Sequence, residues 1–163
     1  MLNRKTFGQG VTLVELLVVL VILSVLAAVA IPQAEVMVRR DKEIELRSSL
    51  RTIRIAIDQF HSDWVAGRIA HDDEYASDDG YPVNLEVLVE GVPTTSAIGG
   101  DRYYLRRIPI DPFAVPGEFD RSQWVLRGYQ DSPDGSNWGG QDVYDIRTAS
   151  DKIALDGTYY NAW

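Results

Sequence analysis

VTLVELLVVLVILSVLAAVAIP, residues Val11–Pro32, is an apolar run in which Leu16–Ile31 is interrupted only by Ser24. At about 1.5 Å per residue, a helix counted from Val11 is long enough to cross the ~30 Å hydrocarbon core of a bilayer. Glu15 lies inside the run, where a carboxylate costs roughly 2.5 to 3.5 kcal/mol on insertion scales, so it requires a partner or a function. Residues 11–32 are therefore predicted to form a transmembrane helix.

The flanks and the composition limit what the rest of the chain can be. Arg4 and Lys5 precede the run, so the amino terminus is predicted to be cytoplasmic and the remainder of a single-pass chain to lie outside. The 163 residues are 45% hydrophobic, which argues against disorder, and the net charge of −8 argues against a nucleic-acid partner. The chain has no cysteine, which excludes a disulfide scaffold or a zinc ribbon.

One long helix is predicted to begin at the start of the apolar run and to continue well beyond it. No glycine occurs from residue 11 to residue 66, and Pro32 is the only proline before residue 82, so the helix is predicted over Thr12–Trp64 with a kink or local loosening at Pro32. Residues 33–66 are predicted to be its amphipathic half, with charged side chains such as Glu43 and Arg47 on the solvent-facing sides. The apolar stripe recurs at intervals of four and three residues: Leu46, Leu50, Ile53, Ile57, Phe60 and Trp64.

Residues 67–163 are predicted to form a globular domain, because all tyrosines and tryptophans lie at or beyond Trp64. Asn84 is expected to cap a short helix over LEVLVE that Gly91 stops. At least two of four short runs should pair as antiparallel strands, and together with the long helix they predict an α+β fold. The four runs are Tyr103–Ile108, Gln123–Tyr129, Val143–Arg147 and Lys152–Leu155.

With the preceding KTFGQG, residues Lys5–Gly10, the apolar segment resembles the class III signal of type IV pilins and type II secretion pseudopilins. That signal has a short basic leader ending in glycine, a hydrophobic first mature residue, Thr-Leu-x-Glu, a long apolar run and a proline. This chain departs from it in having Val11 where phenylalanine is usual. The resemblance implies the type IV pilin-like fold, with residues 1–10 as a leader peptide. It also implies that a prepilin peptidase cuts between Gly10 and Val11 and methylates the amine of Val11.

The same resemblance assigns Glu15 to assembly. The amine freed on Val11 can pair with the Glu15 carboxylate of a neighbouring subunit inside an apolar bundle, which offsets the desolvation of both charges. The implied product is a homopolymer built by an inner-membrane assembly platform and a secretion ATPase, with minor pseudopilins as further partners. The precursor would span the inner membrane once, with residues 67–163 in the periplasm.

Segments in the second half resemble one branch of the family, the major pseudopilin or G-type subunit of type II secretion. They are Tyr81-Pro82, the LEVLVEG stretch, YYLRRIPIDPF at Tyr103–Phe113 and the C-terminal segment Tyr144–Trp163, YDIRTASDKIALDGTYYNAW. The implied function is a structural subunit of the periplasmic pseudopilus, a filament thought to push exoproteins through an outer-membrane secretin. No enzyme is predicted, since the sequence has no Gly-rich phosphate loop, nucleophile elbow or HExxH motif.

The C-terminal segment binds calcium in major pseudopilins, so the resemblance implies a calcium site here. Calcium requires six to eight oxygen ligands from carboxylates, hydroxyls and carbonyls. Two sets of residues are candidates, and the first departs from the family by having Lys152 where a glycine is usual. The first set is Asp145, Thr148, Asp151 and Asp156, and the alternative set is Asp131, Asp134, Asn137 and Asp142.

Other interpretations stay open at the level of sequence. Ala28-Val29-Ala30 satisfies the rule for an ordinary signal peptide, although Glu15 and the continuing helix argue against cleavage there. A type IV pilin or a minor pseudopilin would share the amino-terminal features. A membrane-anchored periplasmic module that never polymerises would not need Glu15.

Overall fold

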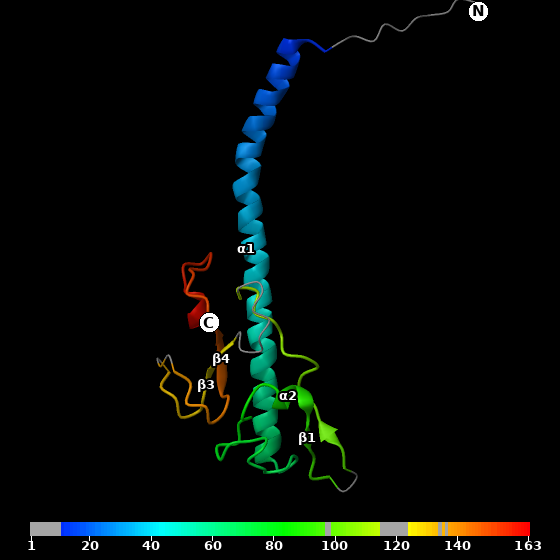
Figure 1. The fold of residues 1–163 in the computed structure, drawn as a ribbon, viewed down its shortest axis with the longest axis vertical. Coiled ribbons are helices and arrows are strands. Elements are labelled where there is room, and N and C mark those ends of the chain that lie inside the picture. The colour runs from blue at the N-terminus through cyan, green and yellow to red at the C-terminus, as the bar shows by residue number, and fades with distance from the viewer. Residues whose placement is uncertain (1–10, 97–98, 115–123, 134, 136) are drawn as a thin grey trace, which may run out of the picture. The chain divides into compact units, whose positions relative to one another are not determined.

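The computed structural model describes residues 11–96, 99–114, 124–133, 135 and 137–163 (Figure 1). The chain forms two compact units, one that ends at Arg40 and one that spans Asp41–Trp163. Helix α1, Leu13–Val65, contributes its first part to one unit and its second part to the other. Its bounds agree within one residue with the helix predicted from the sequence, and it continues without interruption through position 32.

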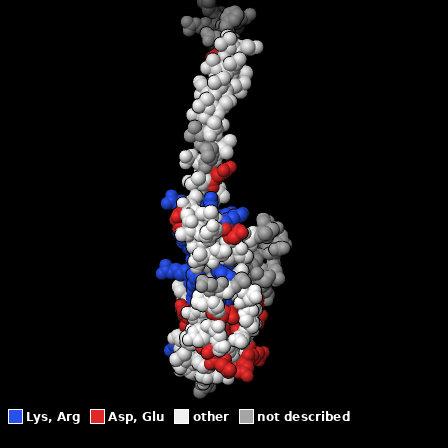
Figure 2. All heavy atoms as spheres, turned by 90° about the vertical axis from the view of Figure 1, so that its left-hand side faces the viewer, with Lys and Arg blue, Asp and Glu red and all other residues white. Residues whose placement is uncertain are grey.

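In the first unit, α1 exposes its apolar side chains on all sides. Leucine, valine and isoleucine side chains from Leu13 to Leu26 are about half exposed or more, and Figure 2 shows a surface almost free of charge over this part of the helix. Among the described residues, α1 is the one helix long and apolar enough to cross a membrane. A helix that is apolar all round and has no protein partner needs an apolar environment, so the predicted membrane segment is consistent with the structure.

In the second unit, the predicted stripe of α1 forms the centre of the core. Leu46, Leu50, Ile53, Ile57 and Phe60 are each at most 2% exposed, because residues three and four apart share one helical face. The rest of the core comes from residues far along the chain that pack against this face. They include Leu88, Val92, Trp124, Val143, Ile146 and Tyr160.

The strands form two small antiparallel sheets. In one, β1 (Val92–Pro93) pairs with β2 (Asp101–Arg102), and in the other, β3 (Trp124–Arg127) pairs with β4 (Asp145–Thr148), with Trp124 opposite Thr148. In the view of Figure 1, β1 lies on one side of the second part of α1, and β3 and β4 lie on the other. This arrangement confirms the α+β, pilin-like fold predicted from the sequence.

Two of the four predicted strand runs are strands, and two are not. β3 and β4 fall at Gln123–Tyr129 and Val143–Arg147, whereas Tyr103–Ile108 and Lys152–Leu155 contain no strand. The first of these bonds to a helix instead of a sheet, since the backbone N–H groups of Tyr104 and Leu105 both donate to the carbonyl of Leu88. Lys152–Leu155 is part of a turn that contributes a single bridge, Ile153 to Tyr159.

The predicted short helix is present as α2, Val87–Glu90. The Asn84 side-chain oxygen accepts a hydrogen bond from the Val87 backbone N–H at 3.0 Å, which satisfies one of the free donors at the helix start. Gly91 ends the helix with φ of 93°, a conformation that side chains disfavour. A Cβ at this position would lie 2.7 Å from a ring carbon of Tyr103, so that ring, which is 61% exposed, would have to move. Farther along the chain, a short 3₁₀ helix, η2, covers Tyr160–Ala162.

Candidate functional site

The amino-terminal motif forms a capped helix start. The Thr12 side-chain oxygen accepts a hydrogen bond from the Glu15 backbone N–H at 3.2 Å, and the Thr12 carbonyl accepts one from Leu16 at 3.1 Å. Thr12 is therefore the N-cap of α1, and this explains why a threonine three residues before a glutamate suits this position. Glu15 lies in the first turn, where a negative charge interacts favourably with the helix dipole.

The two residues of the predicted assembly contact, Val11 and Glu15, are exposed to solvent in the structure. Val11 is 71% exposed and Glu15 is exposed, and within the described part of the chain no cation pairs with Glu15. Gly10 lies outside the described residues. A carboxylate on an otherwise apolar helix surface can accept an ion pair from a second molecule, as the sequence suggested.

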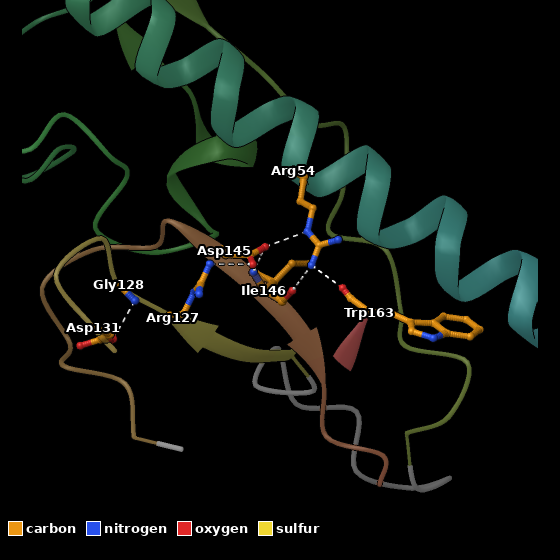
Figure 3. Close-up of polar contacts among 7 residues, drawn as sticks. All are labelled: Arg54, Arg127, Gly128, Asp131, Asp145, Ile146 and Trp163. Carbon is orange, nitrogen blue, oxygen red and sulfur yellow. Dashed lines mark hydrogen bonds and ion pairs between the residues drawn. The ribbon is translucent and has the colours of Figure 1, made fainter. Parts of the chain in front are cut away.

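In the second unit, the C-terminal segment is fixed to α1 by charged side chains that the apolar pattern did not identify. Arg54 donates hydrogen bonds to three oxygens: Asp145 Oδ1 at 2.7 Å, the Ile146 carbonyl at 3.0 Å and the Trp163 main-chain oxygen at 2.7 Å (Figure 3). Arg127 on β3 donates to the other oxygen of Asp145 at 3.1 Å. The carboxylate of Asp145 is thus shared by two guanidinium groups.

Glu43 makes a second attachment, deeper in the unit. Its side chain is among the buried residues, 5% exposed, and its Oε1 accepts hydrogen bonds from the Tyr160 hydroxyl and the Leu155 backbone N–H, both at 2.8 Å. One turn later, Arg47 pairs with Asp156 at 3.0 Å and its guanidinium stacks 3.9 Å from the Trp163 ring centre. The prediction that Glu43 faces solvent was wrong, because Glu43 lies on the same helical face as the buried Leu46. Its hydrogen-bond partners lie more than a hundred residues away in the sequence.

The first set of predicted calcium ligands is dispersed among these contacts. Asp145 is bound by arginines, Asp156 pairs with Arg47, and the Thr148 hydroxyl donates to the buried carboxylate of Asp111. Asp151 is exposed. Hydrogen bonds from Thr158, and then the Arg47 guanidinium, hold the pKa of Asp156 below its usual range. This set of oxygens does not fit a calcium ion as arranged, because two of its three carboxylates, Asp145 and Asp156, are bound by arginines and the Thr148 hydroxyl is bound to Asp111.

The alternative set is partly assembled. Asp131 and Asp142 both approach Gly128, where an added Cβ would lie 3.1 Å from an oxygen of each. Asp131 accepts hydrogen bonds from the backbone N–H groups of Gly128 and Gly139, which lower the pKa of its carboxyl. Asn137 is exposed, and Asp134 lies outside the described residues. Among the residues that are described, no group of three or more acidic or histidine side chains could hold a metal, and calcium binding by this loop stays a prediction.

A further buried carboxylate, Asp63, fixes the end of α1. It is 2% exposed and accepts from Arg68 at 2.7 Å and from the Tyr104 hydroxyl at 3.1 Å, and it forms an ion pair with Arg102. Burial, and then the hydrogen bond to Asp63, raise the pKa of Tyr104 well above its usual value. Helical spacing contains the signal for both buried acids, since Glu43 lies three residues before Leu46 and Asp63 three residues after Phe60 on the same stripe.

Comparisons with known proteins agree with the amino-terminal motif and with the branch of the family that the sequence resembles. Residues 8–31 match the model of the prokaryotic N-terminal methylation motif. The type II secretion system core protein G of Pseudomonas aeruginosa is 34% identical over 119 residues, which cover 68% of this chain and 72% of that protein. No solved structure matches the chain significantly. The methylation motif and the extent of this identity together show that the chain belongs to the family of the type II secretion system core protein G, the major pseudopilins.

Proposed function

We propose that the chain is made as a membrane-held precursor and becomes, after processing, the repeating structural subunit of a type II secretion pseudopilus. The observation that carries the proposal is the combination of a matched methylation motif with an exposed, all-apolar helix that bears a single carboxylate in its first turn. The role is structural and not enzymatic, in line with the family.

Processing creates a positively charged group that can pair with the Glu15 carboxylate. Cleavage between Gly10 and Val11 by a prepilin peptidase would free an α-amine on Val11, which is exposed and precedes the Thr12 cap. Methylation converts this primary amine into a secondary amine, which stays protonated and positively charged at neutral pH. The amine can then serve as the partner of a Glu15 carboxylate on a neighbouring subunit.

Polymerisation would bury the apolar side chains that a single subunit exposes on the first part of α1. Apolar helices that bundle side by side cover each other's side chains, and each pairing of Val11 amine with Glu15 carboxylate removes two isolated charges from an apolar environment. An isolated carboxylate there costs roughly 2.5 to 3.5 kcal/mol, so a subunit in the wrong register is penalised by about that amount. The second unit would form the periplasmic surface of the filament. The inner-membrane platform, the secretion ATPase and minor pseudopilins are the partners that the family implies.

The test is whether Glu15 is required for assembly. In the host, Glu15→Gln and Glu15→Ala should abolish the ladder of crosslinked oligomers while the protein still accumulates in the membrane. Ser24→Ala is the matched control, since Ser24 is the one polar residue within Leu16–Ile31 and its hydroxyl bonds within its own helix to the Leu20 carbonyl at 2.8 Å. Ladders that persist in both Glu15 variants would refute the proposed assembly contact.

A further inference from the structure

The C-terminal segment is where the family resemblance places calcium, yet two of its three aspartates, Asp145 and Asp156, already have cationic partners, and the third, Asp151, is exposed. Asp145 receives Arg54 at 2.7 Å and Arg127 at 3.1 Å, and Asp156 receives Arg47 at 3.0 Å. These arginines come from α1 and β3, so they connect the segment to the rest of the second unit.

The oxygens that bind Arg54 are of the kinds that bind calcium. A structural calcium ion is held by carboxylates and backbone carbonyls of a loop. Arg54 reaches one carboxylate, that of Asp145, and two main-chain oxygens, those of Ile146 and Trp163 (Figure 3). A guanidinium is a permanently charged, planar group with five donors, so one side chain can bridge several oxygens. Through these contacts it joins β4 to the residue that follows η2.

The surroundings of Asp145 also disfavour a second cation. The pocket beside this carboxylate is lined by the side chains of Arg54, Arg127 and Arg147. Two guanidinium groups bound to one carboxylate leave net positive charge at this place, and Arg147 adds another positive residue to the pocket lining, so a divalent cation is repelled. The Thr148 hydroxyl, another predicted ligand, already donates to the buried carboxylate of Asp111.

We infer that Arg54 takes the structural place of a calcium ion in this chain, so that the segment Tyr144–Trp163 folds and stays attached without metal. The inference concerns the second unit only and goes beyond the proposed function. Its failure would leave the roles of Val11 and Glu15 unaffected, because the two experiments read different parts of the chain.

The first test compares full-length protein in detergent micelles with calcium and with a chelator. Thermal unfolding followed by tryptophan fluorescence should give the same Tm in millimolar CaCl₂ and in EGTA. In EGTA, Arg54→Gln should lower Tm by about 5 °C or more, whereas Arg51→Gln should change it by about 2 °C at most. Arg51 is the matched control because it is an exposed arginine one turn earlier on α1. Equal effects of the two substitutions, or a calcium-induced rise in the Tm of the unmutated protein that is lost in Asp145→Asn, would overturn the inference.

Hydrogen exchange shows where any calcium acts. Amides of residues 144–163 should exchange at the same rate with and without calcium, and Arg54→Gln should speed their exchange roughly tenfold. Protection by calcium that is confined to residues 128–142 would place an ion at Asp131 and Asp142 and would leave Arg54 as the cation of the C-terminal segment. Slower exchange in residues 144–163 on adding calcium, lost in Asp145→Asn, would overturn the inference.

Discussion

Replacing Tyr160 by phenylalanine should destabilise the second unit more than the loss of a single hydroxyl group would suggest. The Tyr160 side chain is fully buried, and its hydroxyl donates to Glu43 Oε1 at 2.8 Å. Phenylalanine keeps the ring, so the stacking on Phe113 at 4.2 Å and the edge contact with Trp163 at 5.1 Å remain. The substitution therefore removes the hydroxyl that donates to Glu43 and little packing.

The expected cost follows from the burial of Glu43. A hydrogen bond to a charged group contributes about 1.5 to 3 kcal/mol, and a buried carboxylate that loses a donor has no water to replace it. Glu43 is 5% exposed and keeps the bond from the Leu155 backbone N–H at 2.8 Å. We expect Tyr160→Phe to lower the free energy of unfolding by about 1.5 to 3 kcal/mol, which for a unit of this size lowers Tm by about 5 to 12 °C.

Urea unfolding in detergent micelles measures this change through tryptophan fluorescence, since all four tryptophans lie in the second unit. The midpoint should fall with an unchanged slope. Tyr159→Phe is the matched control, because the neighbouring tyrosine is 54% exposed and its loss of a hydroxyl should change stability by about 0.5 kcal/mol at most. Equal midpoints for Tyr160→Phe and Tyr159→Phe would refute the reasoning that the buried Glu43 depends on this donor.

Three further outcomes follow from the second unit. Phe60→Ala, at a fully buried position, should lower the free energy of unfolding in urea by about 3 to 5 kcal/mol, whereas Ile55→Ala, at a position 45% exposed, should lower it much less. Similar losses for the two variants would mean that the stripe is not the core. Gly91→Ala should cost about 1 kcal/mol or more, because its φ of 93° is a backbone conformation that side chains disfavour; an unchanged Tm would contradict that conformation. Because the folded state raises the pKa of Tyr104, its contribution is complete below about pH 10 and is lost as pH rises above that value; Tyr104→Phe should weaken the alkaline loss of stability, and an identical pH profile would count against it.

The long helix and its core stripe could be predicted because burial on one helical face imposes a periodicity that the sequence displays. The five predicted residues from Leu46 to Phe60 follow that period and are buried, and the sixth, Trp64, is partly buried against the same core. The amino-terminal motif was equally accessible, since a carboxylate inside an apolar run is costly and therefore informative. Short strands were harder, because runs such as Tyr103–Ile108 carry the same apolar residues whether they bond to a sheet or to a helix carbonyl.

The charged attachments could not be predicted because their partners are far apart in the sequence. Arg54 lies 91 residues from Asp145, and Glu43 lies 117 residues from Tyr160. A charged residue on a helix is predicted to face solvent unless a partner for it is known. For Glu43, the three-residue spacing from Leu46 was the one sequence signal that pointed to the buried face. Acidic residues in a loop have the same appearance in a sequence whether a metal ion or an arginine balances them.

The measurement that tests the proposed function most directly is the intact mass of the protein recovered from membranes of its host with the prepilin peptidase present. Cleavage between Gly10 and Val11 followed by methylation predicts a product that begins at Val11 and is heavier by one methyl group. A product that begins at Ile31 would mean cleavage by an ordinary signal peptidase, and Glu15 would then be absent from the mature protein. That result would contradict the pseudopilus model.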